Sequence, residues 1–152
     1  MRTLGNIIWH IPLCGFLLAA IIFLFGTLLV LTVIASPIGL GLIQLSKFLL
    51  SPYSHSMISK NTMHVEQNQA WEIYGYIIRI IYFPFGLLLA AVMIMEIVFL
   101  TVIIIGIPIA IVLAKALGTC FNPVNKVCVH RTVKDEIQRR KAQEYLDRKM
   151  EK

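Results

Sequence analysis

The chain has 152 residues, of which 58% are hydrophobic and 14% charged, and its formal net charge is +6 at pH 7. An average soluble domain carries roughly 25% charged residues, so the composition excludes an ordinary soluble globular protein. The positive charge does not indicate nucleic-acid binding, because nine of the fourteen Lys and Arg residues fall in Lys126 to Lys152, beside five acids. Such a segment is typical of a solvated tail that is attracted to anionic lipid.

Two long apolar blocks make up most of the chain. Residues 7–48 contain one charged residue and residues 73–117 contain three, and each block is more than forty residues long. About 20 helical residues cross a hydrocarbon core that is about 30 Å thick. The composition therefore predicts an all-α integral membrane protein.

Aromatic residues stand near the ends of these blocks. Trp9 follows the polar N-terminal residues, Tyr53 closes the first block, and Trp71 precedes the second. Because Trp and Tyr are enriched at membrane–water interfaces, we expect these three side chains to be interface anchors. The first apolar run far exceeds the roughly 7–15 residues of a signal-peptide core, so we expect it to be retained.

The two blocks resemble each other in one ungapped alignment, which pairs residues 6–52 with residues 77–123 and is called the repeat alignment below. It contains twelve identities in 47 positions. Leu and Ile matches are expected between any apolar segments, but this alignment also pairs Gly15 with Gly86, Pro37 with Pro108, and Pro52 with Pro123. The pattern predicts a tandem duplication, which is common in membrane transport folds.

Each block is long enough for two crossings joined by a tight turn. We expect that turn near Gly26–Thr27 in the first copy and near Met95–Glu96 in the second. A carboxylate at the bilayer centre costs about 2.5–3.5 kcal/mol, and a turn near the headgroups avoids that cost. On this interpretation Pro37 and Pro108 break the second helix of each hairpin about halfway along, and the chain crosses the membrane four times.

A rival interpretation gives each copy one long helix, ending near Ala35 and Ile105, followed by a short interfacial or re-entrant segment. The basic tail predicts a cytoplasmic C-terminus under the positive-inside rule. Four crossings place the polar 54–72 loop in the cytoplasm, and two crossings place it outside.

The predicted organisation has four parts. They are a first membrane repeat (1–53), a polar connecting loop (54–72), a second membrane repeat (73–124) and a basic tail (125–152). The tail reads as a helix, because Asp135 and Arg139, and likewise Glu136 and Arg140, are spaced as i,i+4 ion pairs.

The repeat resembles the YccF family of bacterial inner-membrane proteins. Asn6-Ile7-Ile8-Trp9 matches the opening of that domain, Ile104-Ile105-Gly106-Ile107-Pro108 matches its centre, and Pro52-Tyr53 and Pro123 match its close. The chain departs from the pattern at Ala35-Ser36, at Arg79-Ile80 and at the missing closing glycines. The resemblance covers roughly residues 1–125. It implies a bacterial inner-membrane location and a two-copy architecture, and it assigns no activity.

The sequence does not indicate an enzyme. It contains no paired carboxylates, no Ser/His/Asp set and no glycine-rich phosphate loop. His55, His64 and Glu66 lack a recognised metal-ligand spacing, and the cysteines lack a C-x-x-C motif. We therefore expect no catalytic residue, no cofactor and no metal site.

The leading hypothesis is an oligomeric channel or transporter-like protein, because four helices cannot easily enclose a pathway alone. Backbone groups freed by proline are tolerated in lipid only where protein or water satisfies them. The two breaks therefore supply candidate pore or gating residues, with simple packing kinks as the alternative: Ser36, Pro37, Gly39, Gly106 and Pro108.

Two lysines follow the breaks and are candidates for a ring of charge at a pore mouth. Lys47 and Lys115 lie near the C-terminal ends of the second helices, where they could equally be anchors that fix helix depth. The alternative function is a non-conducting scaffold or accessory subunit that docks a membrane or cytoplasmic protein through the basic tail. The expected partners are thus the lipid bilayer, further copies of this chain and such a protein.

Overall fold

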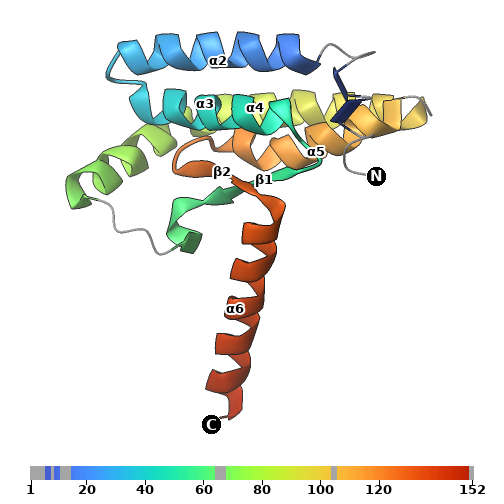
Figure 1. Ribbon diagram of the computed structural model, residues 1–152. Coiled ribbons are helices and arrows are strands. Elements are labelled where there is room, and N and C mark those ends of the chain that lie inside the picture. Colours follow the sequence, from blue (N-terminus) through green and yellow to red (C-terminus); the bar gives the residue numbers. More distant parts are fainter. Residues whose placement is uncertain (1–5, 8, 11–14, 64–67, 104–105, 151–152) are drawn as a thin grey trace.

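The computed structural model describes residues 6–7, 9–10, 15–63, 68–103 and 106–150. This part of the chain is mostly helical, as the sequence predicts (Figure 1). In chain order its elements are α2 (Gly15–Leu31), α3 (Ser36–Leu50), β1 (His55–Ser59), the 3₁₀ helix η1 (Lys60–Met63), α4 (Gln69–Val102), α5 (Ile107–Phe121), β2 (Lys126–His130) and α6 (Arg131–Met150).

The four apolar helices form two antiparallel hairpins, α2 with α3 and α4 with α5 (Figure 1). Small residues make the closest contacts: a Cβ added to Gly26 of α2 would lie 3.0 Å from the carbonyl oxygen of Gly39 of α3. The buried residues of α2 are Gly15, Ala19 and Gly26. Small residues of this kind let helices approach closely in membranes.

The rest of the surface of α2 and α4 is apolar and exposed. On α2 alone, nine large hydrophobic side chains are exposed, and they lie on all sides of the helix apart from its small-residue stripe. Within the described residues one helix, α4 with 34 residues, is long and apolar enough to cross a membrane. The helices α2, α3 and α5 have 17, 15 and 15 residues.

The strands β1 and β2 pair in an antiparallel, two-stranded sheet with Met57 opposite Cys128 at its centre. His55 faces His130 at one end, and Ser59 faces Lys126 at the other. The repeat alignment, extended to the strands, pairs residues 55–59 with residues 126–130. Under this alignment each pair of facing residues in the sheet corresponds to another such pair: the pair His55–His130, for example, corresponds to Lys126–Ser59. A two-fold axis through the central pair therefore relates the two strands.

The repeat alignment also relates the helices. It places the first and last residues of α3 opposite those of α5, and the bounds of β1 opposite those of β2. The last residues of α2 and α4, Leu31 and Val102, are likewise aligned. The alignment that matches the two sequence blocks thus also matches their secondary structure.

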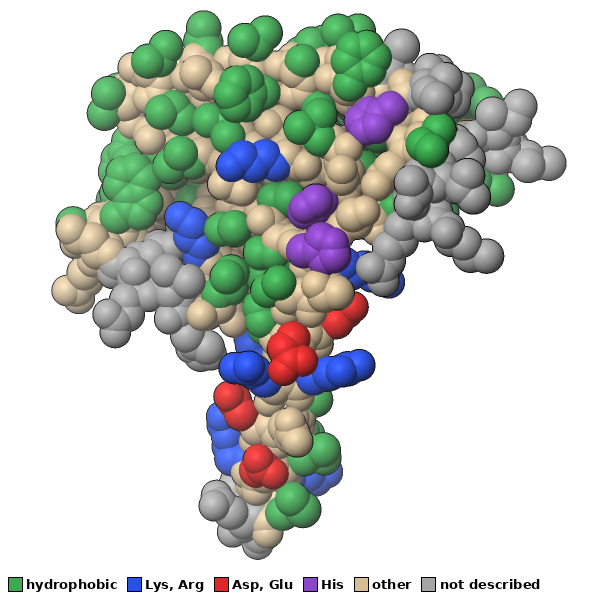
Figure 2. Space-filling view, in the orientation of Figure 1, with side chains coloured by type: hydrophobic (Ala, Val, Ile, Leu, Met, Phe, Trp, Pro, Cys, Tyr) green, Lys and Arg blue, Asp and Glu red, His purple; other side chains and the backbone are tan. Residues whose placement is uncertain are grey.

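The hairpins lie together on one side of the sheet, and α6 extends away on the other (Figure 1). The bend between α2 and α3 lies at one end of this helical layer, and the C-terminal end of α4 lies at the opposite end. Charged side chains gather on α6, whereas hydrophobic side chains cover the hairpin region in the view of Figure 2.

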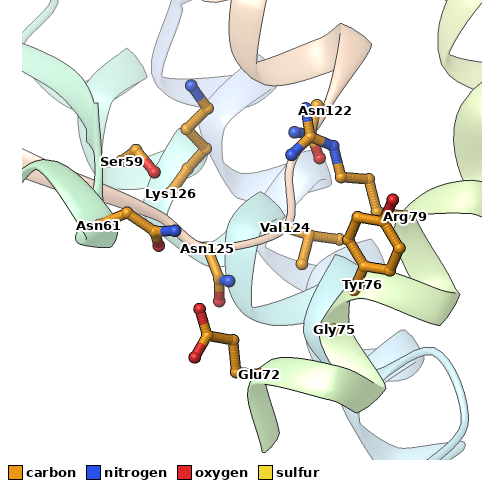
Figure 3. A pocket seen from close by; sticks show the side chains of 10 residues that line it. All are labelled: Ser59, Asn61, Glu72, Gly75, Tyr76, Arg79, Asn122, Val124, Asn125 and Lys126. Atoms are coloured by element: carbon orange, nitrogen blue, oxygen red, sulfur yellow. The ribbon is translucent and has the colours of Figure 1, made fainter. Parts of the chain in front are cut away.

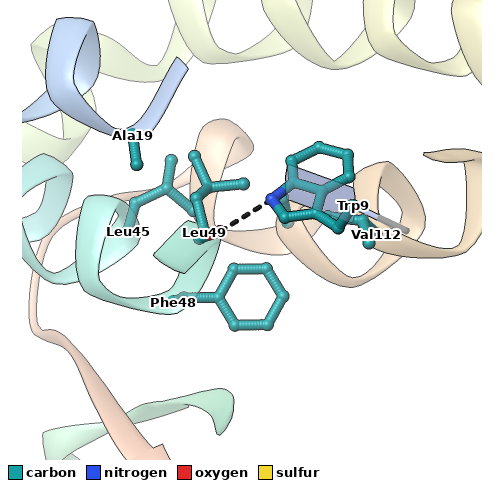
Figure 4. Close-up of a cluster of buried hydrophobic side chains, with 7 residues drawn as sticks. Trp9, Ala19, Leu45, Phe48, Leu49 and Val112 are labelled. Carbon is teal, nitrogen blue, oxygen red and sulfur yellow. Dashed lines mark hydrogen bonds between the residues drawn. The ribbon is translucent and has the colours of Figure 1, made fainter. Parts of the chain in front are cut away.

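A buried cluster joins the N-terminal segment to α2, α3 and α5 (Figure 4). Phe48 is fully buried, and the indole nitrogen of Trp9 donates a hydrogen bond of 2.8 Å to the carbonyl of Leu49. The cluster comprises Trp9, Ala19, Leu45, Phe48, Leu49, Val112 and Ala116.

The expected turn positions are wrong. Gly26 lies inside α2 and Glu96 lies inside α4, and the chain reverses instead between Leu31 and Ser36 and between Val102 and Ile107. Pro37 and Pro108 do not break a helix; each stands in the first two positions of a new one. Proline is favoured there for two reasons. Its fixed φ angle already suits a helix, and the N–H that it lacks would have no hydrogen-bond partner inside the helix. The rival interpretation, with helices ending near Ala35 and Ile105, gives the better boundaries.

The sequence does not predict the two short strands, but the described part of the chain is mostly helical and fits the predicted all-α membrane class. The predicted tail helix is present as α6, and Glu136 and Arg140 form an ion pair of 3.3 Å. Asp135 and Arg139 form no ion pair within the described part of the chain.

Candidate functional site

The first candidate pore position is the break before α3. Ser36 and Pro37 begin that helix, and Pro37 is buried. The hydroxyl of Tyr74, on α4, donates a hydrogen bond of 2.7 Å to the carbonyl of Ile34. A carbonyl at the first break is therefore hydrogen-bonded to the second hairpin.

The second break shows the reciprocal arrangement. Gly106 is the N-cap of α5, and Pro108 follows in its first turn. The hydroxyl of Tyr53, which follows the first hairpin, donates a hydrogen bond of 2.9 Å to the carbonyl of Pro108. Each break is thus contacted by a tyrosine from the other half of the molecule.

The candidate glycines make contacts inside the monomer. A Cβ on Gly39 would lie 2.6 Å from the carbonyl oxygen of Gly26. A Cβ on Gly106 would collide with the carbonyl oxygen of Leu100. These contacts are those of packing positions, which is the alternative that the sequence left open.

The two candidate pore-mouth lysines differ in their surroundings. The ammonium group of Lys115 donates a hydrogen bond of 3.3 Å to the carbonyl of Pro52 and lies 4.8 Å from the centre of the Tyr53 ring. Lys47 is exposed, and it has no hydrogen-bond or ion-pair partner among the described residues. Lys115, on the second hairpin, therefore contacts the end of the first hairpin, whereas Lys47 makes no such contact with the described residues.

The three predicted interface anchors also differ. Trp9 is only 3% exposed, and its indole N–H donates to the last turn of α3, so its side chain lies in the core rather than at the surface of the monomer. Tyr53 is half-buried between the hairpins, and Trp71 is exposed at the start of α4. The second half contains a contact that parallels the one made by Trp9. The hydroxyl of Tyr82 donates a hydrogen bond of 3.0 Å to the carbonyl of Cys120, which the repeat alignment pairs with Leu49.

Sequence reasoning missed a polar pocket at the base of α4. Its volume is about 320 Å³, and it lies between α4, the start of η1 and the connection from α5 to β2 (Figure 3). Its basic residues are Arg79 and Lys126. The only signal for it in the sequence was Arg79, a cation inside an apolar block.

Arg79 lies close enough to Lys126 in this pocket to affect its pKa. Burial lowers the pKa of Lys126, and the nearby Arg79 guanidinium lowers it further. With its amide oxygen turned toward Arg79, Asn122 accepts hydrogen bonds of 2.9 Å from Nε and 3.3 Å from Nη2. The guanidinium is therefore held in place by the end of α5.

A second cavity, of about 420 Å³, lies between the two hairpins and is lined mostly by apolar side chains. Glu96 reaches it from α4. The expected position of this carboxylate at a turn is therefore corrected: it lies among apolar residues of a continuous helix.

No cluster of three metal-ligating side chains occurs among the described residues. His55 and His130 meet edge to face across the sheet, with ring centroids 5.5 Å apart. His64 and Glu66, the other weak metal candidates, lie outside the described residues.

Comparison with known proteins gives one family match. No curated protein and no solved structure matches the chain. The family model of YccF, described as an inner membrane component domain, matches residues 4–55. The match confirms the predicted resemblance over residues 4–55 and points to a membrane location, and the predicted second copy lies outside the matched residues.

Proposed function

We propose that this protein is a non-conducting membrane scaffold that presents α6 to a partner protein. The observation that carries the proposal is the segregation of charge. Eleven of the twenty residues of α6 are charged, none of the twenty is buried, and the helix extends away from the hairpins (Figures 1 and 2). A helix with so few contacts in its own chain is available to another protein.

The apolar stripe of α6 is the proposed docking surface. Val133 and Ile137 lie near the sheet, and Tyr145 and Leu146 extend the apolar positions toward the free end, where both are more than half exposed. Basic residues flank this stripe, so the proposed partner is a protein with an acidic border around an apolar groove.

The channel or transporter hypothesis stays a prediction with less support. It needs the breaks to face a pathway, whereas the carbonyls of Ile34 and Pro108 are hydrogen-bonded to tyrosines of the same chain. Homo-oligomerisation also stays a prediction. The close contacts of Gly39 and Gly106 lie within one chain, so they are no evidence for contact between copies. The exposed apolar surface of α2 and α4 is open to lipid and to further copies alike.

We further propose that the chain arose by duplication of one hairpin-and-strand unit. The support is that one alignment matches α3 with α5 and β1 with β2, together with a strand register that respects the same alignment. The second copy would comprise α4, α5 and β2, and it would therefore extend past the predicted range of 73–124 to His130.

The proposed topology places the sheet and α6 on the cytoplasmic side of a bacterial inner membrane. β1 is paired with β2, and the N–H of Arg131 donates to the carbonyl of Ser54 at 3.0 Å, so the ends of both hairpins lie side by side. Three of the four apolar helices are shorter than the roughly 20 residues that a crossing requires. Hairpins that enter and leave on the sheet side fit these lengths better than four full crossings do.

Flux measurements in liposomes separate the two functions. The scaffold predicts no ion or tracer flux from purified, reconstituted protein, and a reproducible single-channel conductance would establish the channel instead. For docking, a photo-crosslinking residue at Tyr145 should capture a single protein in cells, whereas the same residue at the apolar Leu24 of α2 should not. Equal capture at both positions would contradict the docking role of α6.

Labelling of single cysteines tests the topology. Asn61 and Gln143 should be protected from a membrane-impermeant reagent in intact cells and labelled after the cells are opened. With hairpins that enter from the sheet side, Val33 at the first break should also stay unlabelled from outside. Labelling of Val33 in intact cells would restore the four-crossing topology.

A further inference from the structure

The polar pocket at the base of α4 has the composition of an anion site. Arg79 comes from α4 and Lys126 from β2, so residues far apart in the sequence bring two cations to one cavity of about 320 Å³. Figure 3 shows Arg79 and Lys126 on either side of Asn125, with Glu72 below Asn125. Glu72, the one acid among the described residues that line the pocket, therefore lies apart from the two cations.

Neither cation is neutralised within the described part of the chain. The one ion pair there joins Arg140 to Glu136 on α6, so Arg79 and Lys126 have no described carboxylate within 4.0 Å. The lowered pKa of Lys126 reflects burial and the neighbouring positive charge. An anion between the two side chains would relieve both penalties.

The pocket lies where the apolar part of α4 begins. From Arg79 to the next cation, Lys115, the chain carries a single charge, Glu96. Tyr76, one turn before Arg79, lines the pocket and is 63% exposed. An arginine and an exposed tyrosine at the end of an apolar stretch are typical of the headgroup level of a bilayer.

We propose that this pocket binds the phosphate group of an anionic phospholipid headgroup. The guanidinium of Arg79, oriented by Asn122, offers its remaining N–H groups to two phosphate oxygens, and the ammonium of Lys126 adds a point charge from the other side. The proposal rests on insertion of the hairpins in the membrane, and it is independent of any partner of α6.

Lipid binding measured by native mass spectrometry tests this site. Protein in mild detergent is titrated with phosphatidylglycerol, and with phosphatidylcholine as the zwitterionic reference. Arg79→Gln and Lys126→Gln should each weaken phosphatidylglycerol binding about tenfold, as expected for loss of a charge-assisted hydrogen bond. Glu72→Gln should strengthen it, because the acid of the pocket is removed. Lys47→Gln is the matched control: it removes one exposed cation outside the pocket and should change the affinity less than about twofold.

The other outcomes overturn the proposal. If Lys47→Gln weakens binding as much as Lys126→Gln, the lipid is attracted by net charge and not by this pocket. If millimolar inorganic phosphate displaces phosphatidylglycerol, the site takes free phosphate and not a headgroup. Should Arg79→Gln lower the melting temperature, Lys126→Gln decides alone, because the Lys126 side chain makes no hydrogen bond or ion pair among the described residues. Unchanged affinity in that variant refutes the site.

Discussion

The hydroxyl of Tyr53 donates a hydrogen bond of 2.9 Å to the main-chain carbonyl of Pro108, and so ties the end of the first hairpin to the break of the second. Tyr74 makes the reciprocal contact with Ile34, whose carbonyl lies in the reversal before α3. The carbonyl of Ile34 lies outside a helix, where it is costly to leave unsatisfied in an apolar environment. The two tyrosines thus stabilise the chain reversals and the association of the hairpins at the same time.

Replacement of Tyr53 by Phe should lower the stability of the protein by about 0.5–1.5 kcal/mol, the net contribution of one hydrogen bond. Thermal unfolding in detergent, followed by tryptophan fluorescence, measures the change. Tyr76→Phe is the matched control, since the Tyr76 hydroxyl has no hydrogen bond among the described residues and its side chain is 63% exposed. Equal melting temperatures for the two variants would contradict the role of Tyr53.

Gly41 and Gly118 offer a second matched pair. A Cβ on Gly41 would collide with the carbonyl oxygen of Pro123, whereas a Cβ on Gly118 would meet nothing within 4 Å. Gly41→Ala should therefore force α3 away from the buried Pro123 and destabilise the fold by about 1–3 kcal/mol, as overpacking does. Gly118→Ala should leave stability unchanged or raise it by up to about 1 kcal/mol, the helix propensity gained. A neutral Gly41→Ala would show that this close approach is absent.

Much of the fold could be predicted from the sequence, because its strongest signals are local or periodic. Long apolar blocks predict helices, and the repeat alignment anticipates the matching bounds of α3 and α5. The sequence misplaces the turns, because Gly26 and Glu96 resemble interruptions of a helix. In the structure Gly26 is a contact point for Gly39, and the chain reverses just before each proline.

The strands and the polar pocket could not be predicted, because they depend on pairing between distant segments. β1 is only five residues long and lies in a polar loop, and its partner β2 follows only after the whole second hairpin. Arg79 is visible as an isolated cation, but its neighbour Lys126 belongs to the tail. Only the folded chain places the two in one cavity.

Cys128, opposite Met57 in the sheet, should react slowly with thiol reagents. Burial raises the pKa of its thiol to about 11 from the ordinary 9.0, against a smaller opposing effect of Lys47. At pH 8 about one thiol in a thousand is then ionised, and the thiolate is the reactive form. In a variant with the other cysteines replaced, alkylation should be about a hundredfold slower than for an exposed cysteine, and it should accelerate about tenfold per pH unit.

The control for this measurement is a cysteine-free protein with Met150→Cys, whose position on α6 is 78% exposed. Its alkylation should level off about two pH units below that of Cys128, since its thiol has the ordinary pKa. Equal rates for the two proteins at pH 8 would show that Cys128 is open to solvent and that the sheet does not shield it.

Trp9 and Tyr82 should have equivalent roles in the two halves. Trp9 donates a hydrogen bond of 2.8 Å to the carbonyl of Leu49, and Tyr82 donates one of 3.0 Å to the carbonyl of Cys120. The repeat alignment pairs these two carbonyls, which lie at the ends of α3 and α5. Trp9→Phe and Tyr82→Phe should each cost about 1–3 kcal/mol, because each leaves one carbonyl of the last helical turn unsatisfied.

Trp9→Phe should be the more damaging of the two, since the smaller ring also leaves a cavity in the core. Far-UV circular dichroism during heating measures both variants without relying on the removed tryptophan. Their double variant should lose close to the sum of the single effects if the two contacts act independently. A stable Tyr82→Phe protein beside an unstable Trp9→Phe protein would mean that the second half does not use its aromatic donor as the YccF domain of the first half does.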